Sequence, residues 1–178
     1  RAPAATRVDI AAPSRLHRID PALFSPRGDG QKRFRRGQLI HGLLQRLPDI
    51  ALAQRNEAAR RWLQRQGATP DETATFVREA LAVIDDPRFA AVFAPSSRAE
   101  TPIVGEAAGK AVRGVVDRLA IDGDRILILD FKTDRPAPND SAAAPDSYVL
   151  QLALYREVLR KIFPRKIVSC ALLWTEKP

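Results

Sequence analysis

The stretch that decides the fold is Val112 to Thr133, VRGVVDRLAIDGDRILILDFKT. Two runs rich in Val, Ile and Leu flank Asp122-Gly123-Asp124, and apolar runs around such turn residues predict a β-hairpin. Apolar residues fall on both faces of the two strands, which is typical of strands that lie mid-sheet under helices. The sequence therefore predicts an α/β fold with this hairpin at its centre.

Three charged residues, Asp117, Asp130 and Lys132, interrupt the apolar pattern of the hairpin. If the loop is Gly123-Asp124, as a type II′ turn prefers, Asp117 lies directly opposite Asp130. If the loop is Asp122-Gly123 instead, Asp130 becomes a diagonal neighbour of Asp117. Side chains alternate with a period of two along a strand, so both registers put the two carboxylates and Lys132 on one face of the sheet.

The chemistry of two facing carboxylates suggests a role. Opposed β-carbons lie about 4.5–5.5 Å apart, and two buried carboxylates at that distance repel, so one takes up a proton unless a cation intervenes. A hard divalent ion with oxygen ligands resolves the conflict. The alternative is a structural network in which Asp117 and Asp130 pair with Lys132 and nearby arginines. Because carboxylates are costly within apolar strands, the residues alone favour a metal or catalytic site.

The composition limits the class of protein. A chain of 178 residues with a formal net charge of +8 is long enough for one domain, and its basic balance is typical of proteins with phosphate-rich partners. It holds no methionine and begins Arg-Ala-Pro, so we expect a segment of a longer protein. No apolar run reaches the roughly 18 residues of a membrane span. The single cysteine, Cys170, excludes an intrachain disulfide and a four-cysteine metal site.

The first part of the chain is predicted to be irregular and then helical. Residues 1–32, rich in Pro, Ala, Arg and Gly, predict a linker or irregular extension, and residues 33–93 predict the helical part of a domain that spans 33–178. We expect helices over 33–47, over 50–66, from Thr69 onward and, as a short turn, over 87–93. His41 lies one residue off the apolar stripe of the first helix, so by itself it is either a core histidine or a ligand.

Residues 98–178 predict the sheet core of that domain. A first strand over 98–104 is expected near a sheet edge because Pro102 cannot donate a backbone hydrogen bond. Within it, Glu100 either adds a carboxylate to the site or is simply solvated. The last strand, 166–174, is expected to be buried on both faces.

A helix over 148–163 should connect the hairpin to the last strand as a crossover on the sheet. Its predicted buried stripe consists of Val149, Leu152, Leu159 and Ile162. Gln151 and Tyr155 are four residues apart and therefore share a face of the helix. The loop over 134–146 leaves just after Lys132, so we expect it to serve as a flap over the site.

Four short motifs in order resemble the RecB-type branch of the PD-(D/E)XK nucleases. They are R-G-x-x-x-H (Arg36, Gly37, His41), G-x-x-D (Gly114, Asp117), D-F-K (Asp130, Phe131, Lys132) and Q-x-x-x-Y (Gln151, Tyr155). The segments LIHGLLQRLPD and ALLWTEKP look more narrowly like the C-terminal nuclease domain of AddA, the helicase–nuclease component of bacterial AddAB. The likeness runs over residues 34–178. The absence of a cysteine set argues against AddB, the sister component, whose nuclease domain carries an iron–sulfur cluster.

The resemblance implies a role for each motif residue. The implied metal ligands are the side chains of His41, Asp117 and Asp130 and the backbone carbonyl of Phe131. Lys132 is implied to orient the attacking water or to stabilise the charge that develops on the phosphate. Gln151 and Tyr155 are implied to brace the site and to contact the substrate strand.

The resemblance also implies the fold and the activity. The implied fold is a restriction-endonuclease-like core, a mixed four-stranded sheet flanked by helices, with an N-terminal helical segment. The implied activity is that of a Mg²⁺-dependent DNA nuclease, with Mn²⁺ as a substitute ion, that works in double-strand break repair by homologous recombination. Its implied partners are single DNA strands, AddB and the AddA helicase domains, where ATP is used, in the bacterial cytoplasm. The alternative is a catalytically silent nuclease-like module that docks DNA or a partner protein.

Overall fold

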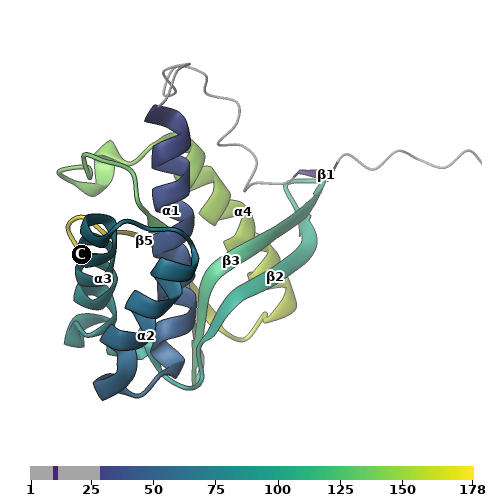
Figure 1. Cartoon of the computed structure of the whole chain (residues 1–178). Helices are drawn as coiled ribbons and strands as arrows, with labels where there is room; N and C mark the ends of the chain where they lie inside the picture. Colours follow the sequence, from purple (N-terminus) through teal and green to yellow (C-terminus); the bar gives the residue numbers. More distant parts are fainter. Residues whose placement is uncertain (1–9, 12–28) are drawn as a thin grey trace, which may run out of the picture.

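A mixed β-sheet with helices on both faces forms the centre of the computed structural model, which describes residues 10–11 and 29–178 (Figure 1). Its four long strands are β2 (Arg98–Ala107), β3 (Lys110–Asp122), β4 (Arg125–Lys132) and β5 (Ile167–Trp174), in that spatial order. The pairs β2–β3 and β3–β4 are antiparallel, and the pair β4–β5 is parallel. The predicted mixed four-stranded sheet is confirmed. A two-residue strand, β1 (Ile10–Ala11), adds to the start of β3 in parallel.

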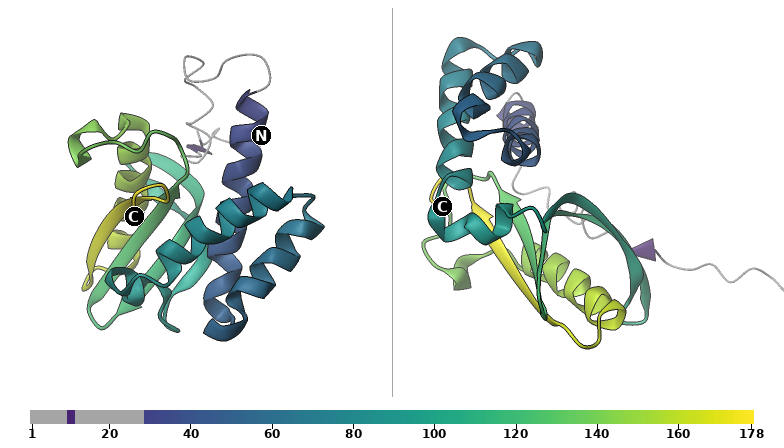
Figure 2. Two further views of the ribbon diagram at one scale, coloured as in Figure 1. Left: turned by 60° about the vertical axis from the view of Figure 1, so that its left-hand side comes forward. Right: turned by 90° about the horizontal axis from the view of Figure 1, so that it is seen from below.

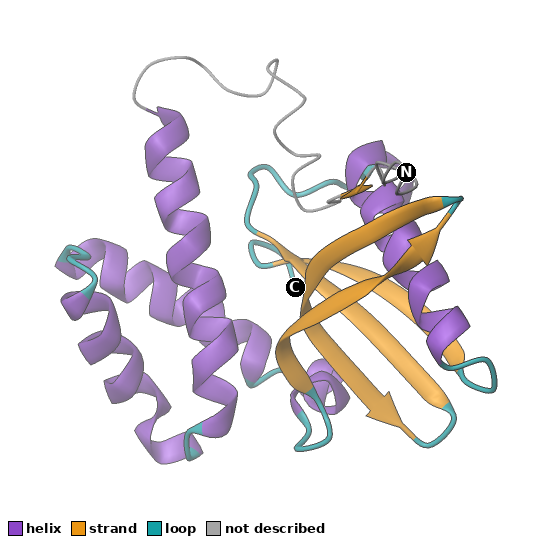
Figure 3. Ribbon diagram, turned by 90° about the vertical axis from the view of Figure 1, so that its right-hand side faces the viewer, coloured by secondary structure: helices purple, strands orange, loops and turns teal. Residues whose placement is uncertain are grey.

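The hairpin adopts the first of the two predicted registers. Asp122 pairs with Arg125, so the loop is Gly123-Asp124, and Gly123 has the positive φ of 51° that favours glycine in such a turn. The β3–β4 ladder ends early, at the pair Arg118–Leu129. Beyond that pair β3 stays with β2, and the long β2–β3 hairpin curves away from β4 (Figure 3). The two central strands therefore separate just where Asp117 and Asp130 lie.

Three helices cover one face of the sheet. They are α1 (Asp29–Arg46), α2 (Leu52–Arg65) and α3 (Pro70–Ile84), joined by the short 3₁₀ helix η3 (Leu47–Asp49) and followed by η4 (Pro87–Phe93). The predicted start of the third helix is confirmed: Thr69 caps it in a capping box with Glu72. The first helix begins at Asp29, ahead of the expected residue 33. Apart from this turn and β1, the predicted extension over 1–32 lies outside the described residues.

Helix α4 (Asp146–Ile162) crosses the other face of the sheet and connects β4 to β5 (Figure 2). Another 3₁₀ helix, η5 (Ser141–Ala143), lies in the loop before it. The sheet thus separates two apolar cores. Leu129, Phe131 and Leu173 pack with α1–α3, whereas Ile126, Ile128 and Val168 of the same two strands pack with α4. This alternation follows from the period of two along each strand.

The predicted buried stripe of α4 is only half right. Leu152 and Leu159 are buried, but Val149 and Ile162 are each 51% exposed. Tyr155, Val158 and the polar Gln151 take their places in the contact with the sheet. Val149 lies on the side of the helix turned away from Gln151 and Tyr155, and Ile162 is the last residue of the helix.

The expected burial of the last strand on both faces is also wrong. β5 pairs only with β4 among the described residues, so it is an edge strand, and its first residue, Ile167, is 55% exposed. At the opposite edge, β2 carries Pro102, as predicted from the missing backbone donor. None of the helices within the described ranges combines the length and the apolar character needed to traverse a lipid bilayer.

Candidate active site

Asp117 lies at the point where β3 and β4 separate. Its carboxylate oxygen Oδ2 accepts a hydrogen bond of 2.8 Å from the backbone N–H of Phe131. That N–H lies beyond the end of the β3–β4 ladder, so the side chain of Asp117 replaces a strand partner for β4. The hydrogen bond orients the carboxylate. The side chain is 17% exposed, so one side of it is open to solvent.

Asp130 lies on the neighbouring strand and is more deeply buried, with 7% of its side chain exposed. Lys132 Nζ lies 2.7 Å from Asp130 Oδ2, and Gln151 Nε2 donates to Asp130 Oδ1 at 3.2 Å. Lys132 therefore shares a face with Asp130, as the strand period predicted. Gln151 reaches the carboxylate from α4, on the opposite side of the sheet from α1.

His41 reaches the cluster from α1. Its Nδ1 lies 3.6 Å from Asp117 Oδ2, and its ring meets the ring of Phe131 edge-on, with centroids 6.2 Å apart. Gly37, one turn earlier, lets α1 approach the end of β4, because a β-carbon there would lie 3.0 Å from Thr133 Oγ1. The structure thus brings His41, Asp117, Asp130 and Lys132 into one cluster.

The electrostatics of the cluster favour an added cation. Burial raises the pKa of Asp130, and the charge of Asp117 raises it further; the positive charges of Lys132 and His41 offset this only in part. For His41, burial by itself lowers the pKa, but the hydrogen bond with Asp117 and the charges of both carboxylates outweigh it, so its pKa is raised. Both carboxylates therefore favour a positive charge on the same imidazole.

Tyr155 connects α4 to the strand that carries Asp117. Its side chain is fully buried, and its hydroxyl lies where a side chain at Gly114 would be: a β-carbon on Gly114 would come within 2.0 Å of it. The two motif residues are thus in direct contact across the α4–β3 interface. This contact supports a bracing role for Tyr155.

Comparison with known protein families identifies this arrangement. A family model described as the PD-(D/E)XK nuclease superfamily matches residues 14–175. The chain belongs to the PD-(D/E)XK nuclease superfamily. It is also 36% identical over 56 residues to the A subunit of an ATP-dependent helicase/nuclease of Desulforudis audaxviator (strain MP104C), a match that covers 32% of this chain and 5% of that protein.

Sequence reasoning missed Tyr148 in this nuclease domain. The ammonium of Lys132 lies over the ring of Tyr148, 3.7 Å from its centroid, and the Tyr148 hydroxyl donates to Asp134, two residues after Lys132. The aromatic ring therefore fixes Lys132 from the side of α4, and its hydroxyl ties down the start of the loop that follows. Spacing could have found it, because Tyr148 is three residues before Gln151 and so lies on the same face of α4.

Glu79 of α3 was missed as well. Its carboxylate is 7% exposed and accepts two hydrogen bonds from Arg36, of 2.5 and 2.7 Å, and others from Thr175 Oγ1 and Arg135. Arg36 also donates to the backbone carbonyl of Thr133, at the end of β4. Glu79 thus connects α1 to the ends of β4 and β5 and holds the helix that carries His41. The signal in the sequence was an acidic residue at a core position of α3.

Glu100 faces Asp117 across the β2–β3 pair, at a break in the ladder. Its φ of 48° is unusual for a residue other than glycine within a strand. Burial and the charge of Asp117 raise its pKa, whereas the charge of His41 lowers it. By surface area Glu100 is exposed, but protein atoms surround part of it, and Asp117 and His41 are near enough to affect its pKa.

The donor types of this cluster fit a hard divalent cation: two carboxylates, one imidazole and the carbonyl of Phe131. Burial and the charge of Asp117 both raise the pKa of Asp130, and a bound cation would offset both effects. Within residues 10–11 and 29–178, however, no three His, Cys, Asp or Glu side chains already converge as a ligand set. Asp117 is turned to the Phe131 N–H and Asp130 to Lys132, so the ligand roles stay predictions.

Proposed function

We propose that this domain is a divalent-metal-dependent deoxyribonuclease that hydrolyses phosphodiester bonds. The observation that carries the proposal is the cluster of Asp117, Asp130 and Lys132 at the split between β3 and β4, with His41 beside it, in a chain of the PD-(D/E)XK nuclease superfamily. The cluster combines negative charge for a metal ion with one ammonium group for a phosphate oxygen or a water molecule.

The ion would be held by His41, Asp117, Asp130 and the carbonyl of Phe131, and we propose Mg²⁺, with Mn²⁺ as a substitute. A bound divalent ion supplies an acidified water and neutralises charge on the phosphate. The residues themselves prepare the site. Gln151 holds one oxygen of Asp130, and the Phe131 N–H holds one oxygen of Asp117, so both carboxylates have fixed orientations.

Lys132 is the group we propose for the water or the developing phosphate charge. Its Nζ lies between Asp130 and the ring of Tyr148, and only 8% of its side chain is exposed. A cation held by Asp130 would compete with Lys132 for that carboxylate and would leave the ammonium available for a phosphate oxygen or a water molecule. Tyr155 would keep α4, and with it Gln151, packed against β3. Its side chain is fully buried, so the role we propose for it is bracing rather than substrate contact.

For the biological context we propose the nuclease part of an AddA-type helicase–nuclease in double-strand break repair. The support is the partial similarity to one component of an ATP-dependent helicase/nuclease, of which this chain covers 5%. In that setting the substrate is single-stranded DNA from an unwound duplex end, and the partners are the helicase domains, which use ATP, and AddB. The expected location is the bacterial cytoplasm.

The test is cleavage of linear single-stranded DNA by the purified chain with Mg²⁺ or with EDTA. Asp117→Asn keeps an acceptor for the Phe131 N–H but removes the charge, and Asp117→Ala removes both. We expect each to lower the cleavage rate by about a hundredfold or more, because removal of a ligand forfeits several kcal/mol of charge stabilisation. Asp122→Ala, at the exposed turn end of the same strand, is the matched control and should keep the wild-type rate.

Direct metal binding separates catalysis from docking. Calorimetric titration with Mn²⁺ should show binding to the wild-type chain and much weaker binding to Asp117→Asn. Equal cleavage by wild type and Asp117→Asn would overturn the proposal. Retained DNA binding without cleavage by the wild type would favour a silent module that docks DNA or a partner protein.

A further inference from the structure

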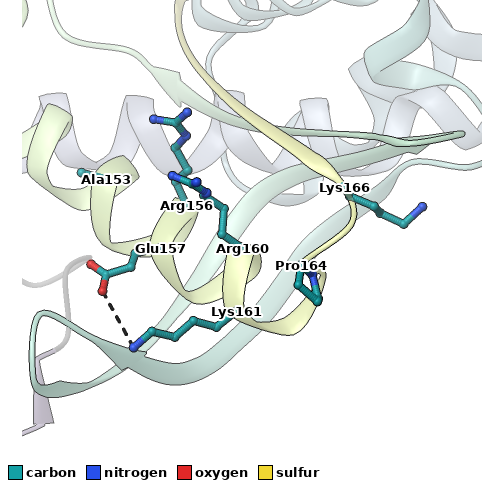
Figure 4. Close-up of a pocket in the computed structure, with 7 residues that line it drawn as sticks. All are labelled: Ala153, Arg156, Glu157, Arg160, Lys161, Pro164 and Lys166. Atoms are coloured by element: carbon teal, nitrogen blue, oxygen red, sulfur yellow. Dashed lines mark ion pairs between the residues drawn. The ribbon is translucent and has the colours of Figure 1, made fainter.

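A hollow of about 550 Å³ lies along the C-terminal half of α4 and the segment that precedes β5 (Figure 4). Four cations line it: Arg156, Arg160, Lys161 and Lys166. The only carboxylate among its lining residues is Glu157. The hollow is therefore a concave, basic surface on the same helix that carries Gln151.

Two of the four cations are fixed by neutral groups. Arg156 Nε donates to the carbonyl of Val168 at 2.9 Å, and Lys166 Nζ donates to the carbonyl of Gly123 at 2.5 Å. A carbonyl orients a cation without cancelling its charge, so both keep donors and a full positive charge for a ligand. Such fixed cations lose less side-chain entropy on binding than free ones do.

The acidic groups near the hollow act mainly on one cation. Glu157 accepts from the backbone N–H of Ala108 at 3.1 Å and lies 3.8 Å from Lys161, and Glu106 lies 3.9 Å from Lys161. Lys161 is thus largely neutralised. Among the described side chains, no carboxylate lies within ion-pair distance of the other three cations, so the hollow keeps a net positive charge.

The simplest explanation for basic residues here is the helix dipole, because cations stabilise the C-terminal turn of a helix. The helix dipole explains Arg160 and Lys161, which lie in the last turn of α4. The dipole does not explain Arg156, which lies one turn earlier, or Lys166, which lies outside the helix just before β5. These three cations, two from α4 and one from the segment before β5, together fit an anionic partner.

We propose that this hollow, with Arg156, Arg160 and Lys166, binds the phosphate backbone of a single DNA strand a few nucleotides from the bond that is cut. The inference rests on the proposed nuclease function. Nine residues of α4 separate Gln151 from Arg160, which is about 14 Å of helix. Arg160 is also half a turn away from Gln151 around the helix, so a strand that leaves the cluster must pass round α4 to reach the hollow.

The binding experiment compares two charge-reversed pairs in an Asp117→Ala background, so that the strand stays intact. Arg156→Glu/Arg160→Glu alters the hollow. Arg61→Glu/Arg65→Glu, an exposed pair with the same spacing on α2, changes the net charge equally and is the matched control. Fluorescence anisotropy with a labelled oligothymidine measures the affinity over a range of salt concentrations.

We expect the hollow pair to lower the affinity by about tenfold or more and to reduce the salt slope by about 1.4, the value for two lost contacts to a single strand. The control pair should change both far less. Equal losses for the two pairs would overturn the proposal, because they would indicate diffuse charge alone. Unchanged affinity in the hollow pair would overturn it too. Arg156→Gln/Arg160→Gln replaces the glutamate pair if the latter lowers the melting temperature.

Substrate length separates this inference from the nuclease proposal. In the cleavage-competent chain, the hollow pair should slow cleavage of long strands but not of dinucleotides, which are too short to reach from the cluster to the hollow. Equal slowing of long and short strands would contradict the inference. If the wild type does not cleave at all but its DNA binding still depends on the hollow, the nuclease proposal is wrong. The hollow then remains a binding site for a DNA strand.

Discussion

The hydroxyl of Tyr155 occupies the space that a side chain on residue 114 would need. A β-carbon on Gly114 would lie 2.0 Å from the hydroxyl oxygen and 2.6 Å from the nearest ring carbon. The two residues belong to different sequence motifs, one just before Asp117 and the other in α4. Their contact explains the glycine, because any larger residue would push α4 away from β3 three residues before Asp117.

Gly114→Ala should lower the free energy of unfolding by about 1–3 kcal/mol, the usual cost of overpacking a core. Tyr155→Leu in the same chain makes room for the added methyl group, so the two changes should not add. Urea denaturation of the single and double variants should give a coupling energy of about 0.5 kcal/mol or more. Effects that add to within about 0.3 kcal/mol would show that the two residues do not constrain each other.

Glu79→Gln should destabilise the domain strongly, because it leaves the buried guanidinium of Arg36 without its counter-charge. Removal of one partner of a buried ion pair typically costs about 3–5 kcal/mol. Glu57→Gln is the matched control: Glu57 pairs with Arg61 on the exposed face of α2 at 3.6 Å, and loss of such a pair costs about 0–1 kcal/mol. Urea denaturation measures both, and similar losses for the two variants would refute a special role for Glu79.

His41 should titrate above its ordinary pKa of 6.5 in the metal-free chain. A raised pKa in the folded state gives stability that is fully present below about pH 6.5 and is lost as the pH rises through the folded value. Unfolding in urea with EDTA should therefore need less denaturant at about pH 8.5 than at about pH 6, and His41→Gln should remove that difference.

The titration itself is measurable by NMR, because the chain has two histidines and His41→Gln assigns the signals. Asp117→Asn should lower the pKa of His41, since burial then acts with less opposition. An unchanged titration curve in Asp117→Asn would mean that the carboxylate and the imidazole do not interact in solution.

Tyr148 should affect cleavage through its ring rather than through its hydroxyl. The ring face lies 3.7 Å from Lys132 Nζ, and such a contact is worth about 0.5–2 kcal/mol. Tyr148→Leu should therefore slow single-turnover cleavage by about twofold to thirtyfold. Tyr148→Phe keeps the ring and should cleave at nearly the wild-type rate. The reverse order of the two variants would assign the effect to the hydrogen bond with Asp134.

The central hairpin was predictable because its information is local. The turn residues limit the loop to two positions, and each loop determines a register and therefore which side chains lie beside Asp117. The structure has the register of the Gly123-Asp124 loop. The same local patterns predicted the helices and the parallel last strand. The early end of the β3–β4 ladder was not predictable, because it depends on how β3 follows β2 rather than on any residue of the hairpin.

The contacts that support the site were harder to predict because they are distant in sequence. Glu79 meets Thr175 and Arg36, and Lys132 meets Tyr148, through packing that no local pattern encodes. The misassigned stripe of α4 has a related cause. Apolar periodicity identified the helix but not its buried face, because the polar side chains of Gln151 and Tyr155 lie on that face. Val149 and Ile162 were therefore wrongly predicted to be buried.

The sheet separates two apolar cores, and the cluster at its split draws His41 from one layer and Gln151 from the other. Each layer alone thus holds an incomplete set of groups. Fraying of either α1 or α4 would dismantle the cluster even while the rest of the molecule kept its shape. The proposed nuclease activity therefore requires both helical layers to be docked on the sheet.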